Sequence, residues 1–415
     1  MTALAPENTE RAARAASRAH LDPFRPQASF VEAERSASGE IVSVATIFLT
    51  NRECPWRCVY CDLWKNTTIE TVPVGAVPAQ IDFALAELRK ERCRQIKLYN
   101  AGSFFDPNAV PPQDFPAIAN RMRGFERVIV ECHPALVGES AVHFRDLLSP
   151  QPHRSVFDAD TGMEESRDAL RIPSPLNGEK VAEGRMRGGN TKDSDSRKNS
   201  NPVASVTTPH PTLSPLRGEG PLTTRSAPVH SHKTRCALSP VGAQLEIAMG
   251  LEVADDALLA RLNKRMTLAM FQRAAESLVS RGIHVRAFVI VKPPFVRADS
   301  EAVNLARRSI DFAFDCGATA VSLIPGRFGP DALRDLAKAG EFAPPSFDTL
   351  EASLDYGIAQ GRGRVFADLW DIESLGGCCH CMPERVARLR EINLRQTVLP
   401  RITCSHAEAK CVPAG

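Results

Sequence analysis

The chain has 415 residues, of which 43% are hydrophobic and 24% are charged, and its formal net charge is +2. A chain of this length can bury a large core and can hold two or three domains. The near-neutral charge gives no indication of a polyanionic partner for the whole molecule, although a local basic face stays compatible with it.

The N-terminal residues 1–20 contain no apolar run, and no stretch of about 18 or more apolar residues occurs elsewhere. We therefore expect neither a signal peptide nor a membrane anchor. Twelve cysteines in a chain without an export signal indicate metal or redox ligands rather than disulfides. The predicted compartment is the cytoplasm.

Apolar runs typical of strands alternate with segments that have helical periodicity. The segment 78–92, for example, repeats apolar residues at i, i+3, i+4 and i+7, which indicates an amphipathic helix. Such alternation predicts parallel βα units, and six of them predict an α/β protein with a partial, open (β/α)6 barrel. In such barrels the active site lies at the carboxyl ends of the strands. The predicted strands are 42–50, 95–100, 127–131, 244–252, 283–291 and 318–324, and the further predicted helices are 140–148, 255–263, 267–281 and 300–315.

A long polar tract interrupts this pattern between residues 152 and 240. It is rich in Pro, Ser, Gly and Thr, and it lacks apolar periodicity, which predicts disorder. The phrase SPLNGE recurs within it as SPLRGE, which indicates an inserted repeat. We therefore expect an N-terminal extension at 1–40, a core barrel at 41–335 that the tract interrupts, and a C-terminal extension at 336–415 with a possible metal site.

Three cysteines follow the first predicted strand directly. Cys54, Cys58 and Cys61 have the spacing Cys-x3-Cys-x2-Cys, and residues 62–65 offer no fourth thiol. A structural zinc site usually has four ligands. Three thiolates can instead hold three corners of a 4Fe-4S cube and leave the fourth iron open to a ligand that is not protein. A zinc site or a simple electron-transfer site is the alternative.

A strand that ends in this cysteine motif, with Tyr60 just before the last cysteine, resembles the radical S-adenosylmethionine (SAM) superfamily. The resemblance implies that the three cysteines hold a 4Fe-4S cluster whose open iron binds SAM, and that Tyr60 lies beside the adenine. It further implies reductive cleavage of SAM to methionine and a 5′-deoxyadenosyl radical. An electron donor such as flavodoxin or ferredoxin is then required.

The same resemblance suggests further SAM-binding positions. Asn100, Gly102 and Ser103 follow the second predicted strand, where the family holds the SAM amino group, but the usual Gly-Gly-Glu is missing and a simple turn is the alternative. Glu252 ends the fourth strand at a position where related enzymes contact the ribose or methionine end of SAM. Glu131 ends the third strand. A carboxylate buried at a strand end is costly without a partner, which favours a functional role for both.

A narrower resemblance rests on the cysteine segment at 44–68, on VKPPF, and on the late stretch ADLWDIESLGGCCHCMPERVARLREINLRQ. These stretches are similar to the radical SAM subunit of archaeal archaeosine synthase and its bacterial relatives. The resemblance implies a modified guanine in tRNA as one substrate class, although bacterial relatives need not share it. A catalytically silent metal-binding scaffold that retains the barrel is the alternative function.

A second group of thiols lies near the C-terminus. Cys378 and Cys381 form a Cys-x2-Cys hook, Cys404 follows a helix-like stretch, and either His380 or Cys411 would complete four ligands. This pattern is typical of a zinc site, but an auxiliary iron–sulfur cluster and thiols without metal remain alternatives.

The arginines of the same stretch allow two interpretations. They either contact a polyanion or form the solvated face of a helix whose apolar residues pack inward. The residues concerned are Arg385, Arg388, Arg395 and Arg401.

Overall fold

The computed structural model describes residues 21–88, 92–149, 242–329, 331–375, 378 and 380–404. The chain divides into two units, and the smaller one, Pro152–Thr208, lies outside the described residues. The tract predicted to be disordered, 152–240, and Cys411 also lie outside them. Everything below concerns the larger unit.

The described strands form one eight-stranded sheet in which the spatial order equals the chain order. β1 is antiparallel to β2, and every later pair is parallel. The predicted α/β partial barrel is confirmed. The strands are β1 (Ala28–Arg35), β2 (Ile41–Leu49), β3 (Gln95–Asn100), β4 (Arg127–Cys132), β5 (Gln244–Glu252), β6 (His284–Val291), β7 (Ala320–Pro325) and β8 (Arg364–Ala367).

The six predicted strands correspond to β2 through β7. The sequence reasoning placed β1 in the N-terminal extension and β8 in the C-terminal extension, where it predicted no strands. Both are edge strands of the sheet. β1 carries charged residues on the face that turns into the barrel, and β8 has only four residues, so neither shows a long apolar run.

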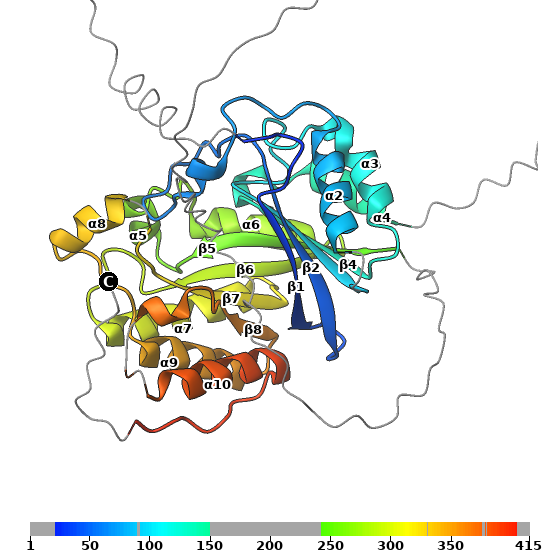
Figure 1. Ribbon diagram of the computed structural model, residues 1–415. Coiled ribbons are helices and arrows are strands. Elements are labelled where there is room, and N and C mark those ends of the chain that lie inside the picture. The colour runs from blue at the N-terminus through cyan, green and yellow to red at the C-terminus, as the bar shows by residue number, and fades with distance from the viewer. Residues whose placement is uncertain are drawn as a thin grey trace, which may run out of the picture. The chain divides into compact units, whose positions relative to one another are not determined.

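Helices cover the outer face of the sheet (Figure 1). α2, α3 and α4 lie beside the early strands, and α7, α9 and α10 lie beside the late ones. α3, α8 and α9 were not predicted. The helices are α2 (Ala76–Glu87), α3 (Phe115–Arg121), α4 (Glu139–Leu148), α5 (Asp256–Arg261), α6 (Leu268–Val279), α7 (Asp299–Asp315), α8 (Asp331–Lys338), α9 (Phe347–Ala359) and α10 (Met382–Arg395), and the short 3-10 turns are η1 (Leu63–Asn66), η2 (Pro112–Asp114), η3 (Pro134–Leu136) and η4 (Ile372–Leu375).

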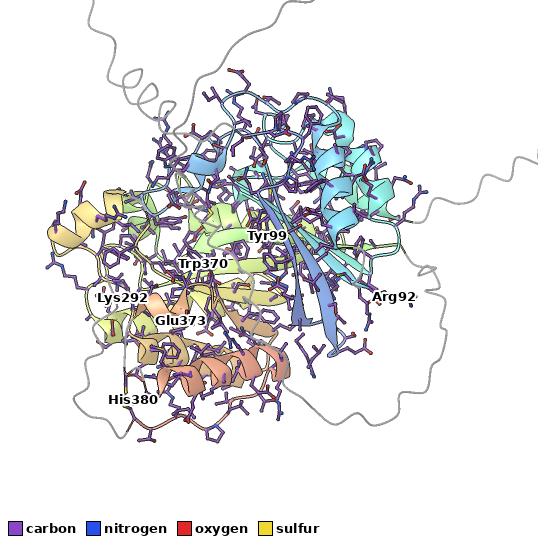
Figure 2. The ribbon with its side chains drawn as sticks, in the orientation of Figure 1. Arg92, Tyr99, Lys292, Trp370, Glu373 and His380 are labelled. Carbon is purple, nitrogen blue, oxygen red and sulfur yellow. The ribbon has the colours of Figure 1, made fainter. Side chains whose placement is uncertain are left out.

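Strand side chains alternate between two apolar environments, as the pleat of a sheet requires. One set packs with the helices in the main core. The other set forms a small separate cluster inside the barrel, which we call the floor. Tyr99, labelled among the strands in Figure 2, belongs to the floor and makes an edge contact with Phe288. The floor consists of Phe30, Phe48, Tyr99, Ile129, Ala248 and Phe288.

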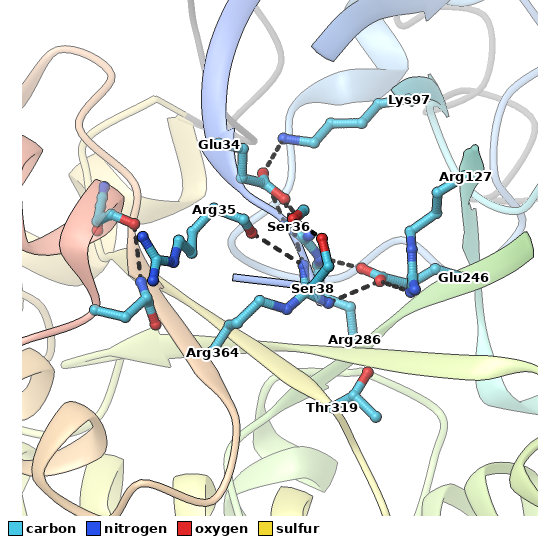
Figure 3. A network of polar contacts seen from close by, with 12 residues as sticks. Glu34, Arg35, Ser36, Ser38, Lys97, Arg127, Glu246, Arg286, Thr319 and Arg364 are labelled. Carbon is cyan, nitrogen blue, oxygen red and sulfur yellow. Dashed lines mark hydrogen bonds and ion pairs between the residues drawn. The ribbon is translucent and has the colours of Figure 1, made fainter. Parts of the chain in front are cut away.

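In the parallel strands β3 to β6, a buried network of charges lies two residues nearer the amino ends than the floor. Arg286 is its centre, with Nε 2.7 Å from Glu246 Oε1 and an amino nitrogen 2.5 Å from Glu34 Oε1 (Figure 3). Lys97, Arg127 and Arg364 supply three further cations to the same two carboxylates. The network and the floor together fill the barrel below the strand ends.

Glu34 illustrates how the network offsets its own desolvation. Burial by itself would raise the pKa of this carboxyl, but the charges of Arg286, Lys97 and Arg364 outweigh burial and hold the pKa at about 2. The pKa of Glu246 is likewise well below its ordinary value, because three guanidinium groups outweigh the effect of burial. Both carboxylates are therefore ionised in the folded protein at neutral pH.

The seam between the edge strands β1 and β8 is bridged by side chains and by α10, which contacts both strands. Arg364 donates from β8 to the carbonyl oxygen of Arg35 in β1, at 3.3 Å. Two amides of the α10 segment pair with the β8 backbone as a ninth strand would: Asn393 bonds both polar groups of Ala367, and Gln396 bonds both of Val365. This pairing satisfies the edge of β8, which would otherwise be open to another chain.

Two arginines of α10 have a role that neither interpretation foresaw. Arg385 and Arg388 are buried, and both pair with the buried carboxylate of Glu351 in α9. Arg388 also pairs with Asp355 at 2.7 Å. These two arginines join α10 to α9 and form neither a solvated face nor an open surface for a polyanion. Arg395 and Arg401 are the exposed members of the set.

Candidate functional site

The cysteine loop begins directly after β2, at the carboxyl ends of the parallel strands. Parallel strands bring these ends to one edge, so the residues that end β3, β4 and β5 lie around the loop. Asn51 joins the ends of β2 and β3, because its side chain exchanges two hydrogen bonds with the backbone of Ala101, at 3.1 and 3.2 Å. The position that sequence reasoning predicted for the loop is therefore the position that the fold gives it.

The segment between α5 and α6 holds the cysteine loop in place. The backbone N–H of Val59 donates to the carbonyl oxygen of Leu262 at 3.1 Å, and Asn263 Nδ2 donates to the carbonyl oxygen of Arg57 at 2.9 Å. Arg57 and Asn263 both have a positive φ, which marks a backbone that tertiary contacts impose.

A stacked pair of aromatic rings joins the cysteine loop to the segment that follows β4. The Trp56 ring lies 4.3 Å from that of His133, which directly follows β4. His133 Nδ1 accepts from the backbone N–H of Ala135, so Nε2 carries the proton and donates to the carbonyl oxygen of Lys264 at 3.1 Å. Burial, and secondarily the Lys264 charge, lowers the pKa of His133 to about 4, so the ring is neutral. Sequence reasoning missed His133, although its place one residue beyond a strand end was a usable signal.

The three thiols of the loop are close to one another but do not converge on a single point. Burial raises the pKa of Cys54 to about 12 and raises the pKa of Cys58 and Cys61, and the mutual charge of the thiols adds to the rise at Cys54 and Cys61. Yet the three Sγ atoms do not all lie within 4.8 Å of one another, the spacing that one ion requires. Thiols that bind three different irons of a cube need this wider spacing. Their donor set therefore fits a 4Fe-4S cluster.

The turn after β3 approaches the first of these cysteines closely. Gly102 has a φ of +127°, and a Cβ at this position would lie 2.9 Å from the Cβ of Cys54. Only a residue without a side chain leaves Cys54 where it is. The neighbouring Asn100 is 1% exposed, and neither its amide nitrogen nor its amide oxygen has a hydrogen-bond partner. An unsatisfied buried amide at the end of a strand is a group that a polar ligand could satisfy.

Ser103, the third residue predicted here, has its hydroxyl committed to the protein. It accepts from the backbone N–H of His133 at 2.9 Å and lies 3.4 Å from Cys132 Sγ, to which it donates. These contacts tie the turn after β3 to the end of β4. Glu131, also predicted, is buried at the end of β4, and its carbonyl oxygen accepts from the backbone N–H of Phe104 at 2.8 Å.

Glu252 forms a buried ion pair with Lys264, with Nζ 2.6 Å from Oε1. Glu252 has a φ of +63° at a bulge that ends β5, which turns its side chain toward the site. Gly250 makes the space, because a Cβ there would lie 2.2 Å from the Glu252 carboxylate. The pair lies near the thiols, since the Lys264 charge lowers the pKa of Cys58 and the Glu252 charge raises it, both after the larger effect of burial. Lys264 and Gly250 carried no signal in the sequence.

Tyr60 lies between the thiols and the core. It is half-buried against the main core, and its hydroxyl is hydrogen-bonded to the Cys58 thiol. Burial, and then the charges of Cys58 and Glu252, raises the pKa of Tyr60 well above its ordinary value, so the hydroxyl is a proton donor at neutral pH. The ring therefore stands beside the second and third cysteines of the loop.

The second thiol group has a different geometry. The Sγ atoms of Cys378, Cys381 and Cys404 all lie within 4.8 Å of one another. Backbone N–H groups of Cys381 and His380 lower the pKa of Cys378 to about 6, whereas burial raises the pKa of Cys381 to about 11. The structure thus brings together the three cysteines that the sequence singled out.

Among the described residues, no helix has both the length and the apolar character that crossing a membrane requires. No family model and no curated protein matches the chain.

Solved structures with partial likeness include three proteins of low sequence identity. The radical S-adenosylmethionine methyltransferase TsrM from Kitasatospora setae is 12% identical over 70% of this chain, with a TM-score of 0.36. SuiB from Streptococcus suis, bound to its precursor peptide SuiA, is 10% identical over 82%, with a TM-score of 0.37. The cobalamin-dependent S-adenosylmethionine radical enzyme OxsB is 14% identical over 64%, with a TM-score of 0.32. The matches span 38%, 50% and 26% of those chains.

Proposed function

We propose that this protein is a radical SAM enzyme that holds a 4Fe-4S cluster on Cys54, Cys58 and Cys61. One observation carries the proposal: three thiols stand together at the carboxyl ends of parallel strands, close enough to influence one another's pKa but wider apart than a single ion allows. Three ligands leave the fourth iron for SAM. When bound, the cluster supplies one electron to the SAM sulfonium, which yields methionine and a 5′-deoxyadenosyl radical that abstracts hydrogen from the substrate.

The surrounding residues bind and orient SAM in this proposal. The unsatisfied amide of Asn100, at the end of β3, and the backbone at Gly102, in the turn that touches Cys54, receive the amino group. Ser103 positions this turn through its bond to His133 rather than by direct contact. Tyr60 lies beside the adenine.

The buried carboxylates act at the other end of the cofactor. Glu252 faces the ribose or the methionine end of SAM, and Lys264 neutralises its charge in the absence of ligand. Glu131, buried at the end of β4, borders the same space. The floor and the charge network close the barrel beneath the site, so a radical formed there is shielded from water on that side.

The substrate is proposed from the resemblance to the archaeosine synthase subunit alone, and a modified base in tRNA is therefore the substrate to test first. A flavodoxin or a ferredoxin would supply the electron. The alternative, a silent scaffold, is disfavoured because the three cysteines, Tyr60 and the space-making Gly102 are all present together.

Anaerobic reconstitution with iron and sulfide, followed by a SAM cleavage assay, tests the chemistry. We expect about four irons per chain at this site and release of 5′-deoxyadenosine under reducing conditions. The triple variant Cys54→Ala, Cys58→Ala, Cys61→Ala should lose both, whereas Cys93→Ala, a half-buried thiol outside both groups, should keep both. A triple variant that still binds the cluster and cleaves SAM would sink the assignment.

The substrate class has a separate test. Mass spectrometry of tRNA nucleosides from a deletion strain should show a missing or accumulated modified base, and the wild-type gene should restore the normal pattern. An unchanged nucleoside profile, from a protein that does cleave SAM, would exclude tRNA modification and leave the radical chemistry standing.

A further inference from the structure

The C-terminal thiol group joins two segments that lie far apart in the chain. Cys378 and Cys381 immediately precede α10, and Cys404 lies beyond its end, 23 residues after Cys381. His380, labelled in Figure 2, lies away from the strands and the floor residue Tyr99. The group is therefore separate from the candidate SAM site.

The chain beyond α10 turns back, and hydrogen bonds and an ion pair anchor it to β8, α9 and α10. Gln396 has a left-handed φ of +53° and ends the helix, and its side chain bonds Val365 in β8. Arg388 then donates to the carbonyl oxygens of Leu399 and Pro400, at 2.8 and 2.9 Å. Arg401 pairs with Asp355 of α9 at 3.0 Å. This path returns Cys404 to the start of the helix.

The spacing of the sulfurs distinguishes one ion from a cluster. Thiolates about 2.3 Å from a tetrahedral zinc ion lie roughly 3.8 Å from one another. The three Sγ atoms of this group all lie within 4.8 Å, whereas those of Cys54, Cys58 and Cys61 do not. Among the cysteines that the structure describes, the C-terminal group is thus the one with the spacing that a single ion requires.

A nitrogen ligand stands beside the group. His380 Nδ1 lies 3.9 Å from Cys378 Sγ, which is close to the separation of two ligands on one tetrahedral ion. His380 is exposed, so its ring can turn toward the sulfurs without disturbing the core. Three soft thiolates and one imidazole form a closed donor set that is typical of structural zinc.

We propose that Cys378, Cys381, Cys404 and His380 bind one zinc ion that fastens the C-terminal segment to the start of α10. The ion closes a loop from Cys381 to Cys404 around the whole helix. Because α10 bridges β1 and β8 and pairs with the edge of β8 through Asn393 and Gln396, the ion stabilises the seam of the barrel and takes no part in chemistry.

Elemental analysis of the full-length protein is the direct test, and it does not depend on SAM cleavage. We expect one zinc per chain in addition to cluster iron, and Co²⁺ in place of Zn²⁺ should give the visible absorption of a tetrahedral thiolate site. The single variant Cys404→Ser removes an exposed side chain and should fold, yet lose the zinc. Cys93→Ser is the matched control and should retain it. His380→Ala should weaken Zn²⁺ binding more than about tenfold in competition with a chromophoric chelator.

The structural role predicts a second readout. Chelation of the ion, or Cys404→Ser, should lower the Tm and expose the segment after α10 to protease, while iron content and SAM cleavage remain at wild-type levels. Iron and sulfide in place of zinc at this group, a disulfide between two of its cysteines, or full zinc content in Cys404→Ser would each overturn the proposal.

Discussion

Arg286→Met tests the charge network beneath the site. Arg286 is fully buried and binds both Glu34 and Glu246, so its loss leaves two buried carboxylates without their central partner. The displacement of the Glu34 pKa from 4.5 to about 2 corresponds to about 3 kcal/mol of stability at neutral pH. Breaking a buried ion pair by removing one partner costs about 3–5 kcal/mol. We therefore expect the free energy of unfolding to fall by about 3–5 kcal/mol.

The assay is reversible urea unfolding of the full chain at pH 7.5, followed by tryptophan fluorescence. Arg94→Met is the matched control, since Arg94 also pairs with two carboxylates, Glu40 and Glu126, but all three side chains are about half exposed. Exposed pairs contribute about 0–1 kcal/mol, so the control should unfold almost as the wild type does.

The stability difference between Arg286→Met and the wild type should also change with pH. In the wild type the folded pKa of Glu34 is depressed, so its contribution is present above the unfolded pKa of 4.5 and is lost as the pH falls through about 2. In Arg286→Met, burial without the guanidinium raises the pKa of this carboxyl, so protonation relieves the defect. The difference between variant and wild type should therefore shrink as the pH falls from 7.5 to 5. A loss below about 1 kcal/mol, or a difference that is constant with pH, would refute the reasoning.

Three further predictions concern the turn, the seam and the tract. Gly102→Ala should lower the iron bound per chain and slow SAM cleavage by about tenfold to a hundredfold, because the new Cβ displaces Cys54. Gly138→Ala is the control: a Cβ there meets nothing within 4 Å, so this variant should match wild type in both assays. Asn393→Ala and Gln396→Ala should each lower the free energy of unfolding in urea by about 1–3 kcal/mol, since each leaves buried backbone groups of β8 unpaired; unchanged unfolding curves would contradict the pairing. Replacing 152–240 with a short Gly/Ser linker should leave iron content and SAM cleavage intact. The tract joins α4 to the start of β5, and the amino end of a strand is opposite the carboxyl ends that carry the cysteine loop. The free energy of loop closure changes by only about 0.6 kcal/mol per doubling of loop length, so the shorter linker should cost little. A linker variant that binds iron but fails to cleave SAM would show that the tract contributes to the site.

Local sequence determined the central strands and the position of the first thiol group. β2 and β5 through β7 are buried on both faces and appear as largely apolar runs, whereas β3 and β4 mix apolar residues with buried polar ones such as Lys97 and Arg127. The motif of Cys54, Cys58 and Cys61 is equally local, because eight consecutive residues of one loop contain all three ligands. For the same reason the sequence placed this loop at the end of a strand, where the structure has it.

The supporting residues of the site depended on contacts across the fold. Lys264 follows Glu252 by twelve residues, and its role appears only when the bulge of β5 and the space at Gly250 bring the two charges to 2.6 Å. His133 and Trp56 belong to segments far apart in the chain, and only parallel pairing of the strands stacks their rings. No local periodicity encodes such meetings, since each requires a particular register between distant strands.

The closure of the barrel was decided in the same way. β1 shows no apolar run in the sequence, because it turns charged residues into the barrel. β8 is too short to be recognised from the sequence, and the side chains of Asn393 and Gln396 form the hydrogen bonds that a further strand would make with it. The sequence alone identified Cys378, Cys381 and Cys404 as candidate ligands and left zinc, an iron–sulfur cluster and bare thiols open. The structure shows that the three Sγ atoms lie at the spacing of ligands to one ion, because the chain returns along α10. The distances between these sulfurs depend on the side chains that anchor the returning segment, such as Arg388 and Arg401, and not on the number of residues between the cysteines.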